Sequence, residues 1–516
     1  MRIYSHVNKG YAGQLIGIEA DLRNGFPGFD IVGLPDGAIR ESRHRIRSAL
    51  RNSGFRFPKE RVLVNLVPAD LPKGGAQLDL AIAVALIIAT TKSYPHADIP
   101  VMIVGELGLD GTIHPTNGTT AALASAKAVG CTGFICPAVS DIPAQGASIN
   151  CIPALSLQEA VKAVMKHLTE CPPTGKTSMR SRQILVDDRS ETEPFKGVVG
   201  LHQVRRAMEI AVAGRHSLLL FGPPGAGKTM MATRLRFLAP TLNEQELEEL
   251  AIIYSNVPDT HTPRSRPLRI LPHDATVRTL LGEAHGGKPG EISLAHNGVL
   301  LLDELPSYSA KVLDTVRQVS DRGIAVSGST TEKSNGYPAK IQLVGTMNPC
   351  PCGGLGQRDA ACICSTAAIR RHWAKVGTPL LDRFDIRIPV VPERLFGQDQ
   401  GQKRDGHVKD SGLHTRIDTA VNRQRRFWEG TSDIRYNSDA LKFGNAGIPP
   451  QLEQIVEQLV SRRPVERKSI RAILSTCTVA LTIAHLEDRE YPTEKELDEA
   501  MGYQRYGLRD IYWGDA

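Results

Sequence analysis

The chain lacks the features that mark a membrane or secreted protein. Its longest apolar stretch, residues 78–89, contains Asp79 and is too short to span a bilayer, so we expect a buried helix there. Residues 1–13 are mixed and polar, and we expect no secretory signal. The nine cysteines of the 516-residue chain are an odd number, which favours reduced thiols over a disulfide framework. These absences predict a cytoplasmic protein with no membrane partner.

Neither charge nor composition is extreme. Lys and Arg number 62 against 55 Asp and Glu, a formal net charge of +7, and hydrophobic residues make up 41%. These values are ordinary for a soluble globular protein, and the mild positive excess allows a nucleic-acid partner without requiring one. The length predicts about three domains.

Sequence patterns divide the chain into two α/β regions and a helical end. Residues 1–170 alternate strand-like runs with helical periodicity, which predicts an α/β or α+β domain. A linker at 171–194 precedes a second α/β segment at 195–395. A polar, glycine-rich linker at 396–413 precedes a helical domain at 414–516. The helices expected in that last domain span residues 417–428, 450–461, 469–486 and 493–501.

Residues 222–229 read GPPGAGKT and follow the apolar run 217–221. A strand, a glycine-rich turn and a helix in this order predict a phosphate-binding loop, whose backbone N–H groups surround the phosphates of ATP. Lys228 can reach the β- and γ-phosphates, and Thr229 can ligate Mg²⁺. The alternative is a chance glycine-rich turn. The loop residues expected to contact ATP are Gly222, Pro223, Pro224, Gly225, Ala226, Gly227, Lys228 and Thr229.

Two later apolar strands end in polar side chains. Residues 299–302 are followed by Asp303, which can hold Mg²⁺ through water, and Glu304, which can polarise the attacking water. The run 341–347 leads to Asn348, which would lie beside the phosphates on a parallel sheet and could orient the water or touch the γ-phosphate. The alternatives are a capped core strand for the carboxylates and a turn before proline for Asn348.

Two arginines are candidates for stabilising charge on a transferring phosphoryl group. Arg383, in LLDRFD, could reach the γ-phosphate of a neighbouring subunit. The alternative is a local salt bridge with Asp382 or Asp385. Arg471, at the start of a predicted helix, is a similar candidate, and its alternative is an ordinary surface arginine.

Four cysteines fall in one short window. Cys350 and Cys352 form one C-x-C pair, Cys362 and Cys364 form a second, and nine residues separate the pairs. Four thiolates at this spacing suit a structural tetrahedral Zn²⁺. The alternative is four free cysteines in a loop, and a disulfide pair fits a reducing compartment less well. The other five cysteines show no ligand spacing and are expected to pack in the interior.

The order of these motifs resembles the magnesium-chelatase-like branch of the AAA+ ATPases, and more narrowly the YifB/ComM family. The similarity covers nearly the whole chain and is carried by GPPGAGKT, PGEISLAHNGVLLLDELP, MNPCPCGG and LLDRFD. The resemblance implies that Asn348 is sensor 1, Arg383 the arginine finger and Arg471 sensor 2. It also implies a homo-hexamer in which segments 282–296 and 322–340 face a central channel. Lys288, Lys333 and Lys340 are then candidate pore residues or ordinary surface lysines.

The first domain carries two segments, 67–79 and 105–113, that resemble the Lon-type protease domain, a ribosomal-S5-like fold. Lon-type enzymes need a serine nucleophile and a lysine base. Residues 75–77 are Gly-Ala-Gln where the serine would stand, and 115–120 contain no lysine, the nearest being Lys127. We therefore predict a platform without proteolytic activity. Its basic stretch, 40–51, could contact phosphate backbones or be a solvated helix face.

The fold class implied by the resemblance is α/β, with an AAA+ P-loop core, a helical C-terminal lid and an N-terminal Lon-protease-like α+β domain. The implied function is ATP-driven helicase or branch-migration activity in homologous recombination, including natural transformation. ATP and Mg²⁺ would be the cofactors, and single-stranded or branched DNA the partner. Two alternatives use the same core, a magnesium-chelatase-type motor subunit and a protein-remodelling ATPase. The Lon-like domain argues against the first, because the chelatase motor lacks it, and nothing in the sequence excludes the second.

Overall fold

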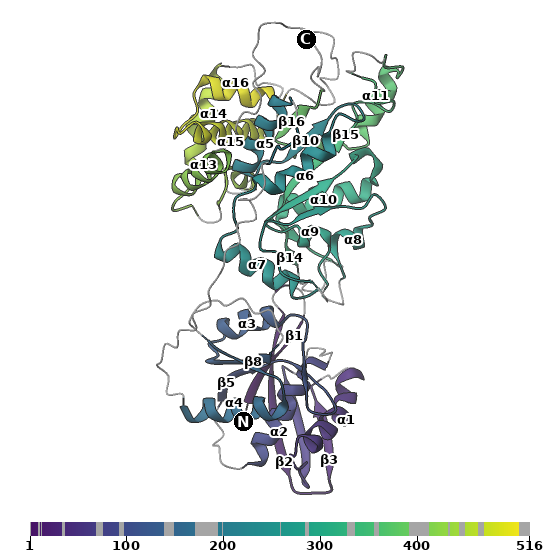
Figure 1. Ribbon diagram of the computed structural model, residues 1–516, viewed down its shortest axis with the longest axis vertical. Coiled ribbons are helices and arrows are strands. Elements are labelled where there is room, and N and C mark those ends of the chain that lie inside the picture. The colour runs from purple at the N-terminus through teal and green to yellow at the C-terminus, as the bar shows by residue number, and fades with distance from the viewer. Residues whose placement is uncertain are drawn as a thin grey trace.

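The computed structural model describes most of the chain in two bodies, an N-terminal body up to residue 170 and a larger body from residue 194 (Figure 1). The described residues are 2–8, 11, 13–33, 37–68, 76–91, 98–138, 149–170, 194–198, 200–257, 260–283, 288–327, 336–355, 361–391, 412–431, 434–442, 449–462 and 469–504. Most of both expected linkers, 171–193 and 396–411, lies outside this set. The mixed α/β class is confirmed, whereas the division into domains stays a prediction.

The N-terminal body is built on a seven-stranded sheet with the order β3-β4-β2-β1-β5-β8-β9. Its strands are β1 (Arg2–Val7), β2 (Gln14–Arg23), β3 (Gly28–Val32), β4 (Arg61–Val67), β5 (Asp98–Ile103), β8 (Gly133–Pro137) and β9 (Asn150–Ala154). Its helices are α1 (Gly37–Asn52), α2 (Asp79–Thr90), α3 (Thr119–Ala128) and α4 (Leu157–Glu170), and the short pair β6 (Glu106–Leu107) and β7 (Ile113–His114) forms a separate antiparallel hairpin.

Helix α2 is the buried helix expected at residues 78–89. Every residue from Asp79 to Ile88 is buried, because α1, α4 and the sheet surround it. Asp79 is tolerated in this apolar helix because Arg45 Nε on α1 donates a hydrogen bond to its carboxylate at 2.7 Å. A buried carboxylate needs such a partner to stay charged. Asp79 therefore links α2 to α1 through its contact with Arg45.

The larger body contains a five-stranded parallel sheet with the order β11-β12-β15-β10-β16. Its strands are β10 (Leu218–Phe221), β11 (Leu268–Ile270), β12 (Val299–Leu302), β15 (Gln342–Met347) and β16 (Ile386–Pro389). Around it lie α5 (His202–Gly214), α6 (Lys228–Leu238), α7 (Glu244–Tyr254), α8 (Val277–Leu281), α9 (Glu291–Leu294), α10 (Ala310–Arg322), α11 (Thr366–Ala374) and α12 (Thr378–Leu381). The strands β13 (Ile324–Ala325) and β14 (Tyr337–Pro338) pair as an antiparallel ribbon beside it.

Both faces of the parallel sheet are covered, which explains why its central strands are mainly apolar. Successive residues of a strand point to opposite faces. Leu218 and Leu220 join the core formed with α5, α6 and the C-terminal helices, whereas Leu219 and Phe221 join the core formed with α8, α10 and α12. The sheet is therefore held rigidly between two helical layers, and its edges are fixed in space.

The C-terminal part is helical, as predicted. It contains α13 (Leu413–Phe427), α14 (Pro450–Arg462), α15 (Ile470–Leu486) and α16 (Glu494–Gly502), and these match the four predicted helices to within a few residues. Ser469 and Thr493, both expected inside helices, are the N-caps of α15 and α16. Helix α15 lies at the centre of this group and packs on α5, so the helices cover one face of the parallel sheet (Figure 1).

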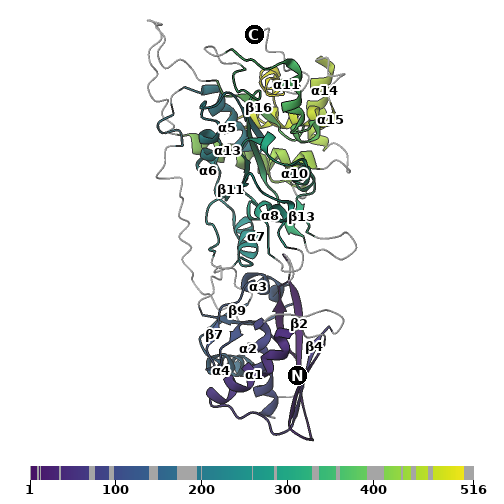
Figure 2. The ribbon, with the colours of Figure 1, turned by 90° about the vertical axis from the view of Figure 1, so that its right-hand side faces the viewer.

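The two bodies meet end to end where α3 approaches α7 (Figure 2). The backbone N–H of Gly118 donates to the carbonyl of Ser255 at 2.6 Å, and Lys127 Nζ lies 3.5 Å from Glu248. The rings of Tyr11 and Tyr337 meet edge to face with centroids 6.4 Å apart. The β13–β14 ribbon of the larger body is thus in contact with the N-terminal body.

None of the helices in the described ranges is both long enough and apolar enough to cross a bilayer.

Candidate nucleotide site

The glycine-rich loop 222–229 lies at the carboxyl end of β10, as its sequence predicts. Gly225 and Gly227 adopt positive φ angles of 75° and 88°, a conformation that favours glycine. Gly222 has no room for a side chain, because a Cβ there would lie 2.3 Å from the carbonyl oxygen of Val390. Gly227 is the N-cap of α6 and provides no side-chain hydrogen bond, so the first-turn N–H groups of α6 have no side-chain cap. Such N–H groups bind anions well.

Lys228 is directed into this loop. Its Nζ donates to the carbonyl oxygens of Gly222 and Pro223 and to Asn348 Oδ1, each at 2.9 Å. Burial lowers the pKa of Lys228, and the charges of Glu304 and Asp303 oppose that shift. The lysine and Asn348, which are 120 residues apart in sequence, therefore meet at the same edge of the sheet.

The predicted Mg²⁺ ligands are neighbours. Asp303 follows β12, and its Oδ1 accepts a hydrogen bond from Thr229 Oγ1 at 2.8 Å. A hydroxyl and a carboxylate beside a phosphate loop are the oxygen donors that Mg²⁺ prefers. These two residues therefore fit a Mg²⁺ ion that also contacts bound phosphates.

Glu304 has the left-handed backbone conformation, with φ 53° and ψ 60°. A residue that is not glycine adopts it only when its surroundings impose it, and such positions cluster at functional sites. The carboxylate oxygens of Glu304 lie 3.3 and 3.4 Å from Asn348 Nδ2. The structure therefore brings together Lys228, Asp303, Glu304 and Asn348, all predicted from their positions after strands.

Thr346 is a site residue that the sequence analysis missed. It is buried in β15, its Oγ1 donates to Asp303 Oδ1 at 2.5 Å, and it accepts the backbone N–H of Glu304 at 2.9 Å. One hydroxyl thus bonds the carboxylate of Asp303 and the backbone of Glu304. The signal available in the sequence was a threonine near the end of a mainly apolar strand, two residues before Asn348.

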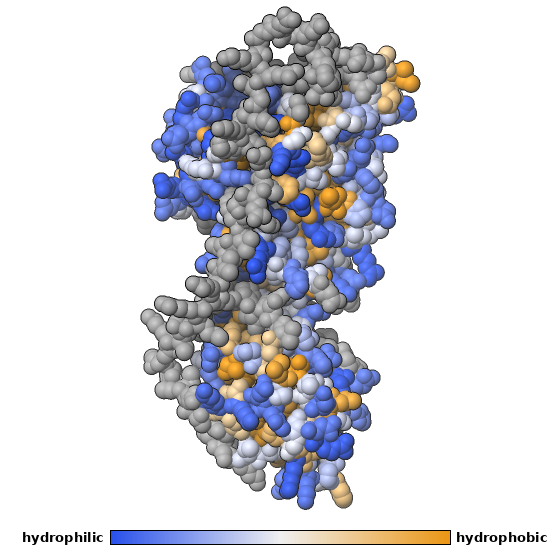
Figure 3. Space-filling view, in the orientation of Figure 1, coloured by the Kyte–Doolittle hydropathy of each residue, from blue (hydrophilic) through white to orange (hydrophobic). Residues whose placement is uncertain are grey.

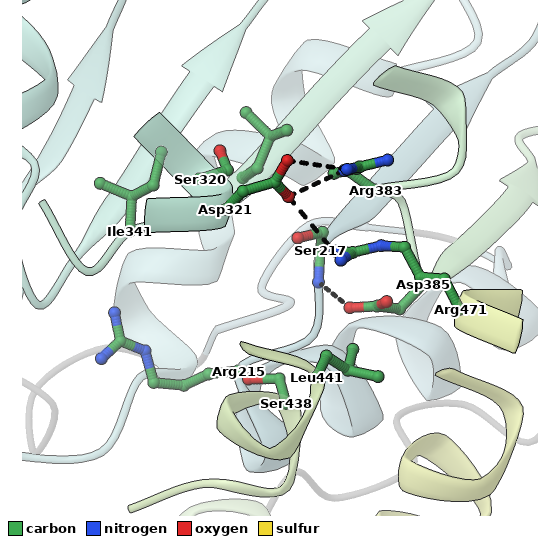
Figure 4. Close-up of a pocket in the computed structure, with 11 residues that line it drawn as sticks. Arg215, Ser217, Ser320, Asp321, Ile341, Arg383, Asp385, Ser438, Leu441 and Arg471 are labelled. Atoms are coloured by element: carbon green, nitrogen blue, oxygen red, sulfur yellow. Dashed lines mark hydrogen bonds and ion pairs between the residues drawn. The ribbon is translucent and has the colours of Figure 1, made fainter. Parts of the chain in front are cut away.

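Arg383 and Arg471 lie elsewhere. They line a pocket of about 380 Å³ together with Arg215, Ser217, Asp321 and Asp385 (Figure 4). Ser217, Ile341 and Asp385 come directly before β10, β15 and β16, so the pocket is at the amino ends of these strands. Because the sheet is parallel, this edge is opposite to the one that carries the phosphate loop.

The alternative for Arg383, a salt bridge with Asp382 or Asp385, does not match the partner that the structure gives it. Its Nε and Nη2 donate to the two carboxylate oxygens of Asp321 on α10 at 2.9 and 2.7 Å, rather than to Asp382 or Asp385 (Figure 4). Arg471 is half-buried, lies 3.7 Å from the same Asp321 and donates to the carbonyl of Asp382 at 3.2 Å. Burial lowers the pKa of Arg471. Asp321 thus holds two arginines at one surface.

The four cysteines of the short window converge. Their sulfurs all lie within 4.8 Å of one another, and those of Cys350, Cys352 and Cys362 are 3.4, 3.6 and 3.7 Å apart in pairs. Four sulfurs about 2.3 Å from a tetrahedral Zn²⁺ would lie about 3.8 Å apart. The backbone N–H groups of Gly354 and Leu355 point to the sulfurs of Cys352 and Cys350, each at 3.4 Å. These contacts fit a metal-binding knuckle, and all described cysteines are free thiols.

The remaining predicted residues have simple surroundings. Cys131, Cys136 and Cys477 are buried, Cys151 is partly buried, and Cys171 lies outside the described residues. Lys288 is exposed and Lys340 half-buried, whereas Lys333 is also outside. In the N-terminal body, Gly75 is outside the described residues and Lys127 faces Glu248 of the larger body.

Comparison with known proteins finds two family models that match parts of the chain and relatives that cover nearly all of it. Residues 194–396 match the family model described as magnesium chelatase, subunit ChlI, and residues 18–140 match the model described as subunit ChlI of Mg-chelatase. Competence protein ComM of Haemophilus influenzae is 32% identical over 516 residues, which cover 97% of each chain. YifB of Escherichia coli is 34% identical over 95% of this chain and 94% of its own. Lon protease 2 of Bacillus subtilis is 23% identical over 32% of this chain and 34% of its own length.

A first test concerns Thr346. Thr346→Val removes the hydroxyl that orients Asp303 and Glu304 but keeps the shape of the side chain, so ATP turnover should fall about 10- to 100-fold. Nucleotide affinity measured without Mg²⁺ should change little. Thr346→Ser, which keeps the hydroxyl, is the matched control and should retain most of the turnover. Wild-type turnover in the valine variant would show that the hydroxyl has no part in the site.

Proposed function

Because the chain belongs to the YifB/ComM family of magnesium-chelatase-like AAA+ proteins, we propose that it is an ATP-driven ring motor that acts on DNA. The observation that carries this proposal is the separation of the site into two halves. The phosphate loop and the carboxylates occupy one edge of the parallel sheet, and the arginine pocket occupies the other. A complete site then requires two chains.

Within one chain, the residues at the carboxyl edge of the sheet would do the following. The loop 222–229 and Lys228 bind the phosphates, and Thr229 and Asp303 hold Mg²⁺. The ion neutralises charge on the phosphate oxygens when it is bound. Glu304 accepts the proton of the attacking water, and Asn348, which contacts both Lys228 and Glu304, orients that water toward the γ-phosphate.

The second chain would supply Arg383 and Arg471. A guanidinium placed at the γ-phosphate neutralises charge that develops in the transition state. Asp321 fixes the position of both arginines before the chains meet, which reduces the loss of side-chain entropy on assembly. A head-to-tail interface generates a ring when the rotation between neighbours closes, and we propose such a ring, a homo-hexamer, as the family resemblance implies.

DNA as the partner is supported by the distribution of charge. Residues 37–61 hold eight Lys or Arg and two Asp or Glu, a net +6 out of +7 for the whole chain. Arg47, Arg51, Arg56 and Lys59 of this segment are exposed. Figure 3 shows hydrophilic residues over the part of the N-terminal body where Figure 1 places α1. Such a surface suits a phosphate backbone.

A role in helicase or branch-migration activity during homologous recombination and natural transformation agrees with the name of one relative, a competence protein. We propose single-stranded or branched DNA as the substrate and a cytoplasmic location, because the described cysteines are all free thiols. The same proposal takes residues 1–170 as a Lon-like platform and residues 414–516 as a helical lid. So does Zn²⁺ as the metal held by Cys350, Cys352, Cys362 and Cys364.

The zinc proposal is tested by metal analysis. Purified protein should contain about one Zn²⁺ per chain, because four thiolates complete a tetrahedral shell. Cys352→Ser/Cys362→Ser should reduce the content to near zero. Cys151→Ser, which lies outside the cluster, is the control and should keep the metal. A wild-type chain purified without chelators and free of zinc would contradict the proposal.

The shared site is tested by mixing two inactive variants. Glu304→Gln should bind ATP but lose about 100-fold or more of its turnover, because the general base is gone. Arg383→Ala should lose about 1,000-fold or more. In a mixture, an Arg383→Ala chain provides an intact Glu304 and its Glu304→Gln neighbour provides an intact Arg383, so part of the turnover should return. No recovery at any ratio would count against a site between chains.

The DNA proposal is tested by stimulation of turnover and by salt dependence. Single-stranded or forked DNA should raise ATP turnover, and Arg47→Glu/Arg51→Glu should weaken DNA binding and flatten its dependence on salt. Arg425→Glu/Arg426→Glu on α13 changes the net charge equally and is the control. Stimulation only by a chelatase partner, or only by an unfolded protein, would instead favour one of the other two AAA+ functions.

A further inference from the structure

The cysteine cluster begins two residues after Asn348 and is continuous with the nucleotide site. Asn348 Oδ1 accepts a hydrogen bond from Lys228, and its Nδ2 faces Glu304. The chain then turns through Pro349 into Cys350, which is fully buried in the core that also contains Phe221 and Met347. The first metal-binding position is therefore anchored in the same packed layer as the strand ends that carry the phosphate loop.

The cluster also touches the phosphate loop directly. Gly353 has a φ of 76°, and a Cβ at this position would lie 2.5 Å from Cδ of Pro224. Atoms in contact need roughly 3.5–4 Å, so only glycine fits here. Pro224 is the third residue of GPPGAGKT. A movement of the loop around Cys352 would therefore displace the backbone that surrounds the phosphates, and a movement of the phosphate loop would press on the cluster.

Helix α11, which follows the second cysteine pair, closes the connection from the other side. His372 Nε2 donates to the carbonyl oxygen of Asn348 at 3.0 Å, and Trp373 Nε1 donates to that of Pro349 at 2.9 Å. The Trp373 ring packs edge to face on Phe221, the last residue of β10, with centroids 5.6 Å apart. The backbone on both sides of the cluster is thus bonded to, or packed on, the nucleotide site.

We propose that the cysteine cluster is a positioning element whose metal occupancy is coupled to nucleotide occupancy. A cation held by four thiolates fixes the backbone from Cys350 onward, which keeps Asn348 directed at Lys228 and Glu304 and keeps Gly353 seated on Pro224. Without the cation, the two C-x-C pairs are free to separate and that backbone is no longer fixed. The inference rests on the proposed zinc site and on ATP binding at the loop, and it does not require DNA.

Coupling between two sites is reciprocal in binding free energy. If metal binding favours the arrangement that binds nucleotide, bound nucleotide must favour retention of the metal by the same factor. Typical couplings change affinity about 5- to 150-fold. This reciprocity separates a positioning role from a merely structural one, because a metal that only stabilised the local fold would bind with an affinity independent of the nucleotide.

The experiment measures the equilibrium partition of Zn²⁺ between the full-length protein and a competing colorimetric chelator, with and without a saturating non-hydrolysable ATP analogue. We expect the analogue to raise the apparent Zn²⁺ affinity of the protein at least about fivefold. Equal Zn²⁺ affinities with and without the analogue, under conditions where binding of the analogue is verified, would overturn the proposal. The readout is independent of turnover and of DNA, so a failure of the DNA proposal would leave this result intact.

Gly353→Ala tests the contact itself. The four cysteines are unchanged, so the variant should retain about one Zn²⁺ per chain. The added methyl group collides with Pro224, so the protection of the metal by the analogue should fall below about twofold. Gly430→Ala is the matched control, because Gly430 also has a positive φ, 87°, but a Cβ there meets no atom within 4 Å. In Gly430→Ala the analogue should protect the metal as it does in the wild type. Full protection in Gly353→Ala, or an equal loss in both variants, would contradict a coupling through Pro224.

Discussion

The parallel direction of five strands is the constraint on which the rest of this protein depends. Every carboxyl end of a parallel sheet lies at one edge, and every amino end lies at the other. Residues 222–229, Asp303 and Asn348 follow strands, whereas Asp385 and Ser217 precede them. Strands of four to six residues separate these edges by about 13–20 Å. The guanidinium of Arg383 therefore cannot reach phosphates bound at the loop of its own chain, and under the proposed function a neighbouring chain completes the site.

The same geometry explains what the sequence could predict. Lys228, Asp303, Glu304 and Asn348 each follow a short apolar strand, and a parallel sheet brings such positions together without further information. The C-terminal helices were predictable because their apolar periodicity is regular, although Ser469 and Thr493, which were expected inside two of these helices, are their N-caps. In both cases the signal is local in sequence and its consequence is fixed by simple geometry.

The features that sequence could not provide depend on contacts between distant residues. Arg383 pairs with Asp321, 62 positions away, although Asp382 and Asp385 are closer in sequence. Asp385 is already engaged, because its buried carboxylate accepts hydrogen bonds from the Ser217 N–H at 3.0 Å and the Ser475 hydroxyl at 2.7 Å. Thr346 looked like any residue of a strand, and its role became visible only when β12 and β15 were placed side by side. The cysteine spacing predicted a metal site, but the contact of Gly353 with Pro224 became visible only in the folded structure.

The central claim is that ATP turnover belongs to the interface between chains, and dilution tests it most directly. Turnover per chain should be measured with saturating ATP and Mg²⁺ while the protein concentration is lowered through the range in which the assembly dissociates, as followed by light scattering. We predict that turnover per chain falls in step with the loss of assembly, because separated chains keep the phosphate loop but lose Arg383 and Arg471 of the neighbour. Constant turnover per chain in fully dissociated protein would contradict the account.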